Sequence, residues 1–146
     1  MAEEPQLPVR PQDDPRIKAL KLLCILTFIG SGMGAFSYGV IGIFHRQFFT
    51  VAAQMLQKEE QELIRLLFSG GRTFFLVSAL FYAFSFRGAW MMWHLKRAGF
   101  HFYTVSQILV LITPMVFIRG FQMPAINVVL TGMFILAYST FLRIMK

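Results

Sequence analysis

The sequence predicts an all-α membrane protein with four transmembrane helices and one amphipathic helix between the first two spans. Three observations support this fold class. Of the 146 residues, 56% are hydrophobic and only 14% are charged, whereas soluble domains carry about 25% charged residues. Four apolar runs lie near or above the length of about 20 residues that a helix needs to cross a bilayer. A chain of this length is expected to form one domain.

The first 16 residues are expected to form a disordered polar tail, ahead of a single transmembrane domain over residues 17–146. The segment "MAEEPQLPVRPQDDP" holds four prolines and four acidic residues. Such a composition cannot bury enough apolar surface to fold. The apolar run starts only after Lys21, so the tail lacks the charged start and short core of a signal peptide.

The first predicted span covers residues 22–44, which contain no charged residue and five glycines. In lipid, helices associate where small residues let their backbones approach closely. Small residues at helical spacing therefore predict a packing face, formed by Gly30, Ser31, Gly34, Ala35, Gly39 and Gly42. This face would pack either within the chain's own bundle or against another protein or a second copy.

The linker after the first span predicts an amphipathic helix over about residues 48–68. Its apolar residues recur at steps of three and four, whereas glutamine and charged residues fill the opposite face. Such a helix lies on the membrane surface or covers the ends of the spans.

The remaining spans are expected over residues 73–93, 102–118 and 124–142. The span over 73–93 contains Arg87, whose long stem can reach the membrane interface. The span over 102–118 is at the short end of the spanning range. Pro124 suits the first turn of the last helix, where its missing N–H costs nothing.

Lysine and arginine predict which side of the membrane each end occupies. With these four spans, nine of the 14 basic residues lie on the side of both termini or snorkel toward it, and five lie on the other side. Because cytoplasmic loops carry the excess of lysine and arginine, both termini are expected in the cytoplasm.

Two sets of polar residues are candidate binding sites. Arg87, Lys96 and Arg97 are candidates for contact with an anionic headgroup or a partner carboxylate, or they only snorkel toward the interface. The third and fourth spans carry a candidate polar pocket formed by Gln107, Asn127, Thr131 and Tyr138. The alternative role of these four residues is interhelical hydrogen bonding, at about 1 kcal/mol each.

The distribution of acidic residues argues against several function classes. All seven lie in the N-terminal tail or in the linker after the first span, whereas ion-coupled transporters and di-metal sites usually need carboxylates within the spans. His94 and His101 lie among aromatic residues typical of a membrane interface, with no third ligand close in sequence. No catalytic motif is found. We therefore expect no enzyme, no cofactor and no metal, and the scattered basic residues predict no nucleic-acid partner.

The segment "LCILTFIGSGMGAFSYGVIGIF", preceded by a basic tail and followed by "LIRLLFSGGR", resembles small uncharacterised four-helix inner-membrane proteins common in Bacteroidota. The resemblance covers mainly the first span and the overall layout. It implies a multi-pass protein of the inner (cytoplasmic) membrane of a bacterium.

Two hypotheses of function follow from these observations. The first is a non-catalytic accessory or assembly subunit of a larger membrane complex, which packs through the small-residue face of its first span. The alternative is a small channel, or a carrier or binder of a lipid or of a small uncharged or anionic molecule. The expected partners are the lipid bilayer and other membrane proteins or a second copy.

Overall fold

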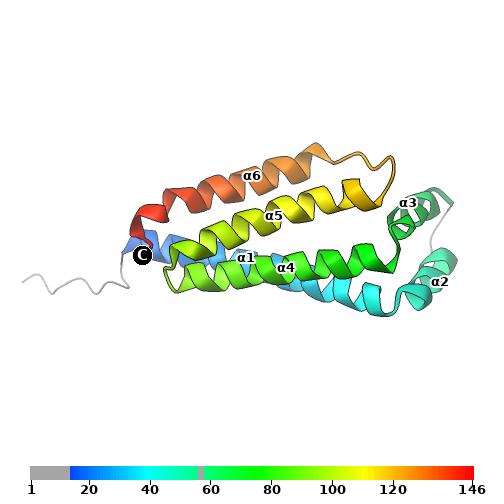
Figure 1. The fold of residues 1–146 in the computed structure, drawn as a ribbon, viewed down its shortest axis with the longest axis horizontal. Helices are drawn as coiled ribbons and strands as arrows, with labels where there is room; N and C mark the ends of the chain where they lie inside the picture. The colour runs from blue at the N-terminus through cyan, green and yellow to red at the C-terminus, as the bar shows by residue number, and fades with distance from the viewer. Residues whose placement is uncertain (1–13, 56–57) are drawn as a thin grey trace, which may run out of the picture.

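The computed structural model describes residues 14–55 and 58–146, without the side chains of residues 58, 59 and 63. This part of the chain forms the helices α1 (Pro15–Ile43), α2 (His45–Met55), α3 (Lys58–Ser69), α4 (Gly71–Trp93), α5 (Arg97–Phe117) and α6 (Ala125–Thr140), and the 3₁₀ helix η2 (Leu142–Ile144) (Figure 1). Four segments are long and apolar enough to cross a membrane, namely α1, α4, α5, and α6 together with η2. The predicted fold class is confirmed: the chain is an all-α, multi-pass membrane protein.

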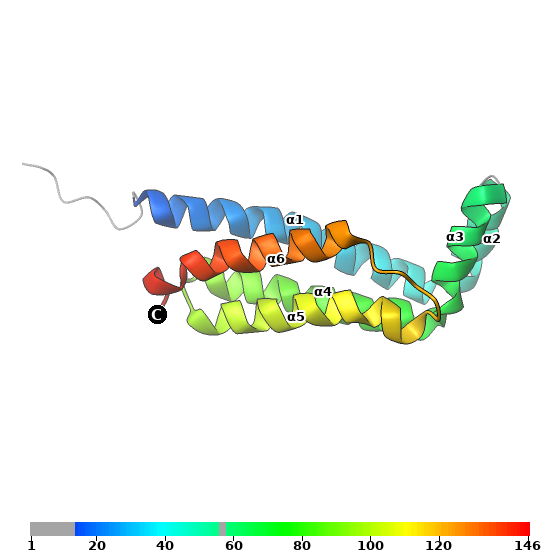
Figure 2. The same ribbon diagram turned by 90° about the horizontal axis from the view of Figure 1, so that it is seen from above.

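The four spans run along the long axis of the molecule, with α4 packed between α1 and α5. Figure 2 shows that α6 runs along the bundle above α4, between α1 and α5. We call the end with the start of α1, the α4–α5 linker and η2 the "η2 end" (Figure 1). We call the opposite end, with α2, α3 and residues 118–124, the "α2 end".

Helix α1 begins at Pro15, seven residues before the predicted start of the first span. Asp14 caps the helix, because its Oδ1 accepts a hydrogen bond of 2.9 Å from the Arg16 amide. Pro15 occupies the first turn, where the N–H that proline lacks would have no hydrogen-bond partner within the helix. The tail expected over residues 1–16 therefore ends earlier, and residues 1–13 of it lie outside the described residues.

Helix α4 ends in a Schellman motif, which leaves only His94–Lys96 as the linker to α5. The Leu95 amide donates to the Met92 carbonyl at 2.9 Å, and the Lys96 amide donates to the Met91 carbonyl at 3.0 Å. Leu95 takes the left-handed position, with a φ of 59°, at a cost of about 1–2 kcal/mol for a residue other than glycine. Its side chain packs against the buried cluster at the η2 end, which offsets part of that cost.

The amphipathic helix expected over 48–68 is two helices, α2 and α3, and residues 56–57 between them lie outside the described residues. Both helices turn across the long axis of the bundle (Figure 2), the orientation expected of helices that lie in a membrane interface. The side-chain amide of Gln61 on α3 donates to the Ala53 carbonyl on α2 at 3.0 Å. The aromatic rings of Phe49 and Phe68 also join the two helices, at a centroid distance of 5.4 Å.

The backbones of α4 and α5 approach each other closely near the η2 end, at two glycines. A methyl group added to Gly88 would lie 2.7 Å from the Tyr103 amide nitrogen and 3.0 Å from the Gly99 carbonyl oxygen. A methyl group added to Gly99 would lie 2.6 Å from the Gly88 carbonyl oxygen. Since real Cβ atoms do not approach backbone atoms this closely, only glycine fits both positions.

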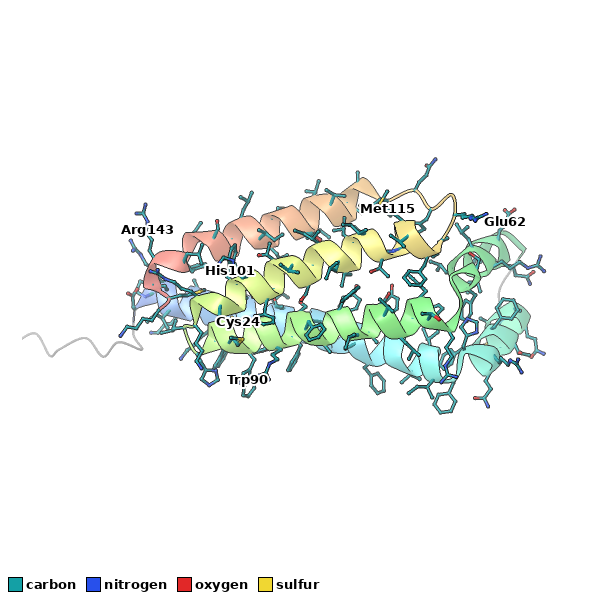
Figure 3. The ribbon with its side chains drawn as sticks, viewed as in Figure 1. Cys24, Glu62, Trp90, His101, Met115 and Arg143 are labelled. Carbon is teal, nitrogen blue, oxygen red and sulfur yellow. The ribbon has the colours of Figure 1, made fainter. Side chains whose placement is uncertain are left out.

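Two buried clusters hold the ends of the bundle. The cluster at the η2 end joins all four spans and contains Leu20, Cys24, Ala89, Met92, Tyr103, Tyr138 and Met145. The cluster at the α2 end contains Phe74, Phe75 and Ile118, with leucines of α3 packed against it. Cys24 lies inside the bundle and Trp90 points away from it, while Arg143 and Glu62 mark the two ends (Figure 3). The middle of the bundle, between the two clusters, is less densely filled.

Candidate intramembrane binding site

The small-residue face of α1 is largely occupied within the chain, against α4. A methyl group at Gly34 would come within 2.7 Å of the Tyr82 ring, and one at Gly42 within 2.8 Å of the Leu76 side chain. Gly39 lies opposite the Ala79 methyl group, at an ordinary contact distance of 3.9 Å from an added Cβ.

The other three residues of this face differ in their surroundings. Ser31 is buried, and its hydroxyl donates to the Thr27 carbonyl at 2.6 Å. Ala35 is half-buried. An added methyl group at Gly30 would meet no atom within 4 Å, because Gly30 faces a cavity.

The basic candidate residues do not converge on one site. Arg87 and Lys96 are exposed, on α4 and at the start of α5. Arg97 instead holds the end of the described chain: its Nε donates to the Met145 carbonyl at 2.7 Å, and its amide donates to the Lys146 carbonyl at 2.9 Å. Arg97 therefore ties the segment after η2 to the α4–α5 linker.

A cavity of about 390 Å³ lies in the middle of the bundle, between the two buried clusters. Its walls come from α1, α4, α5 and α6, with Leu67 of α3 and residues before α6 toward the α2 end. Eight polar side chains line it, namely Thr27, Ser31, Tyr38, Tyr82, Tyr103, Gln107, Asn127 and Thr131. All of them are hydroxyl or carboxamide groups, so the lining offers hydrogen bonds without a charge.

Several of these polar groups already have partners inside the protein. The Thr27 hydroxyl shares a hydrogen bond of 2.8 Å with the Tyr138 hydroxyl. The Gln107 side-chain amide donates to the Ser85 hydroxyl of α4 at 2.9 Å. In contrast, the side chains of Asn127 and Thr131 form no hydrogen bond with any described residue. These two α6 groups are available to a molecule in the cavity.

The four residues of the predicted polar pocket lie in two places. Gln107, Asn127 and Thr131 line the same cavity. Tyr138 does not line it. Tyr138 is fully buried in the cluster at the η2 end, where its ring packs edge-on against Tyr103 at 4.9 Å.

Three of the tyrosines in the spans are site residues that were not predicted from the sequence. The chain contains four tyrosines, and Tyr38, Tyr82 and Tyr103 line the cavity. The rings of Tyr38 and Tyr82 are stacked at a centroid distance of 5.4 Å. The positions of Tyr38 and Tyr82 held a usable signal, because a lipid-facing tyrosine favours the membrane interface, whereas these two lie well inside the predicted spans. Tyr103 held no such signal, because it lies at the edge of the span predicted over 102–118.

The histidines and acidic residues form no second site in the described part of the chain, where no three His, Cys, Asp or Glu side chains gather as metal ligands would. His94 lies at the end of α4, with its Nδ1 at 2.9 Å from the Trp90 carbonyl oxygen. His101 is exposed on α5.

No protein-family model, curated protein or solved structure matches this chain. The residues and the geometry of the bundle are therefore the basis for a functional proposal.

Proposed function

We propose that this protein binds an uncharged, lipid-soluble molecule with hydroxyl or carbonyl groups inside the central cavity. The observation that carries the proposal is a cavity of about 390 Å³ lined by uncharged polar groups, in the middle of a transmembrane bundle. Protein interiors are close-packed, and voids larger than a water molecule are few. The volume falls in the range of about 300–1,000 Å³ that is typical of ligand sites.

The chemistry of the lining supports an uncharged ligand. Among the described residues, no charged side chain lines the cavity, and a charge within the bilayer would need a partner. Stacked tyrosine rings and aliphatic side chains suit an apolar body, while Asn127 and Thr131 supply hydrogen bonds to its polar groups. A binder or carrier of such a molecule fits these groups better than a channel for ions.

A lipid-soluble molecule can enter the central cavity from the bilayer beside α6. Only Tyr138 is buried among the residues of α6, and the helix packs far less closely on its neighbours than α4 does. Gly30 of α1 and Asn127 and Leu130 of α6 line the cavity and are exposed, so the cavity is already open toward the bilayer between these helices.

Filling the cavity from α1 is expected to exclude the ligand. In Gly30→Leu, the new side chain enters space where an added Cβ meets no atom within 4 Å. We expect the amount of bound molecule to fall by about tenfold, which corresponds to about 1.4 kcal/mol. The measurement is the native mass of the protein released from a mild detergent, followed by mass spectrometry of the extracted small molecules.

A matched control is available on α6. An added Cβ at Gly132 also meets no atom within 4 Å, but Gly132 does not line the cavity. Gly132→Leu is therefore expected to carry as much ligand as the unmodified protein. The proposal fails if the unmodified protein carries no small molecule, or if Gly30→Leu carries the same molecule in the same amount.

A second function, an accessory subunit of a larger membrane complex, is supported by the outward face of α6. Exposed apolar side chains recur on it at helical spacing, namely Ile126, Val129, Met133 and Leu136. A span that makes so few contacts within its own chain has room for a partner helix. A native mass equal to one chain, measured after gentle extraction from the native membrane, would contradict this second function.

We also propose that the protein lies in the inner membrane of a bacterium, with both termini in the cytoplasm. Arg16, Lys18 and Lys21 begin α1 at the η2 end, where Lys96 and Arg97 also lie. This excess of basic residues supports a cytoplasmic η2 end.

Cysteine labelling of intact cells is expected to show this orientation. Gln122 and Ala98 are exposed at the α2 end and the η2 end, and the native Cys24 is buried. A membrane-impermeant maleimide should label Gln122→Cys before lysis and Ala98→Cys only after lysis. The reverse pattern would overturn the orientation.

A further inference from the structure

A second hollow, of about 420 Å³, lies at the α2 end and shares no lining residue with the central cavity. It is formed where α1 passes into α2 and where α4 begins. Its lining consists of Ile43, Phe44, His45, Arg46, Gln47 and Arg72. The proposed function does not involve this hollow, so a test of the hollow does not depend on that function.

The lining has a strong positive charge. Arg46 and Arg72 bring two guanidinium groups to one hollow from different helices, and none of the acidic side chains that the structure describes lines it. Both arginines are exposed, and neither forms an ion pair with a side chain that the structure describes. Guanidinium groups bind phosphate oxygens through paired, charge-assisted hydrogen bonds.

The helix geometry adds to this charge. Helix α2, of 11 residues, begins at His45 in the lining itself. Helix α4, of 23 residues, begins one residue before Arg72, and its cap residue Gly70 supplies no side-chain hydrogen bond. The first amide groups of a helix lack partners within the helix and carry partial positive charge, so they favour an anion.

His45 contributes its ring to the lining. Its Nε2 is buried, and no hydrogen-bond partner for it exists among the described residues. The ring is held by Phe68 and Phe75, at centroid distances of 4.9 Å and 5.6 Å. Because Nε2 is covered by protein atoms, it does not reach into the hollow, and the ring forms the apolar side of the lining.

The position of the hollow identifies the anion. Ile43 ends the first span and Gly71 begins the second, and α2 turns there across the bundle axis (Figure 2). The hollow therefore lies at the depth of the lipid headgroups. Ile43 and Phe44 in its lining are exposed apolar side chains, at 59% and 48% of their surfaces, which suits contact with acyl chains.

We propose that Arg46 and Arg72, together with the first amides of α2, bind the phosphate of a phospholipid headgroup. The lipid would lie with its phosphate in the hollow and its acyl chains along the ends of α1 and α4. It would hold the α1–α2 junction at Phe44 against the start of α4.

The test compares lipid binding by native mass spectrometry in a mild detergent, with phosphatidylglycerol, diacylglycerol and inorganic phosphate as probes. Unmodified protein is expected to retain phosphatidylglycerol and to bind diacylglycerol, which lacks the phosphate, at least about tenfold more weakly. In the double variant Arg46→Gln and Arg72→Gln, retention of phosphatidylglycerol is expected to fall by at least about tenfold.

The control is the double variant Arg119→Gln and Arg143→Gln, which removes two exposed arginines outside the hollow. It should retain phosphatidylglycerol as the unmodified protein does. Equal losses in the two double variants would overturn the site, as would equal binding of diacylglycerol and phosphatidylglycerol. Displacement of the lipid by millimolar inorganic phosphate would also overturn the proposal, since the hollow would then take free phosphate.

Discussion

Gly88→Ala is expected to lower the free energy of unfolding by about 2 kcal/mol, although it adds a single methyl group. The new Cβ would lie 2.7 Å from the Tyr103 amide nitrogen and 3.0 Å from the Gly99 carbonyl oxygen, so α4 and α5 must separate. Forcing an extra methyl group into a packed contact costs about 1–3 kcal/mol, and backbone atoms leave no side chain that can move aside. The better helix propensity of alanine returns about 1 kcal/mol.

The sign of the effect distinguishes this contact from a general effect of replacing glycine. Gly132→Ala places the same methyl group where no atom lies within 4 Å, so it should leave stability unchanged or raise it by up to about 1 kcal/mol. Both variants are compared by reversible unfolding in mixed micelles. Equal stability of Gly88→Ala and the unmodified protein would show that α4 and α5 do not meet at Gly88.

Tyr138→Ala is expected to release α6 from the bundle and to lower the free energy of unfolding by about 3 kcal/mol. Tyr138 is the buried residue of α6, and its ring packs against Tyr103 while its hydroxyl bonds to Thr27. Truncation of a buried aromatic ring costs about 3–5 kcal/mol in soluble proteins. The low end applies here, because lipid replaces water as the surroundings of the released helix.

Tyr138→Phe separates the contribution of the ring to stability from that of the hydroxyl. It removes the hydroxyl, which shares a hydrogen bond of 2.8 Å with Thr27 and also contacts the Cys24 thiol, and about 1 kcal/mol is expected for such a bond within a membrane. Limited proteolysis at the η2 end gives a second measurement, since a released α6 should make the segment around the buried Met145 more accessible to cleavage in Tyr138→Ala than in Tyr138→Phe. Equal stability of the two variants would mean that the ring does not anchor α6.

The positions of the spans could be predicted from the sequence because long uncharged runs have few alternatives to a membrane helix. The exact first residue of each helix could not be predicted in this way. Helix α1 begins at Pro15 because Asp14 caps it, and α5 begins at Arg97, five residues before the predicted span, because the preceding turn is tightened by Leu95. Both boundaries depend on local hydrogen bonds that hydropathy does not record.

The inward faces were harder to predict than the spans. Each span is apolar on nearly all sides, so periodicity gives little information about its rotation. The glycines of the first span predicted a packing face at Gly30 and Gly34. Of all the glycines, however, Gly88 and Gly99 make the closest contact between helices. Gln107, Asn127 and Thr131 were predicted as a pocket because polar groups are rare in such runs. Arg46 and Arg72 lie 26 positions apart and meet only in the fold.

The pairing of α1 with α4 has a consequence for the order in which the chain is assembled during synthesis. Trp93, the last residue of α4, follows Ile43, the last residue of α1, by 50 residues. At about 5–20 residues per second, the ribosome needs about 3–10 s to make that stretch. During this interval the glycine face of α1 has no neighbour from its own chain. The insertion machinery, or lipid, must therefore cover that face until α4 arrives.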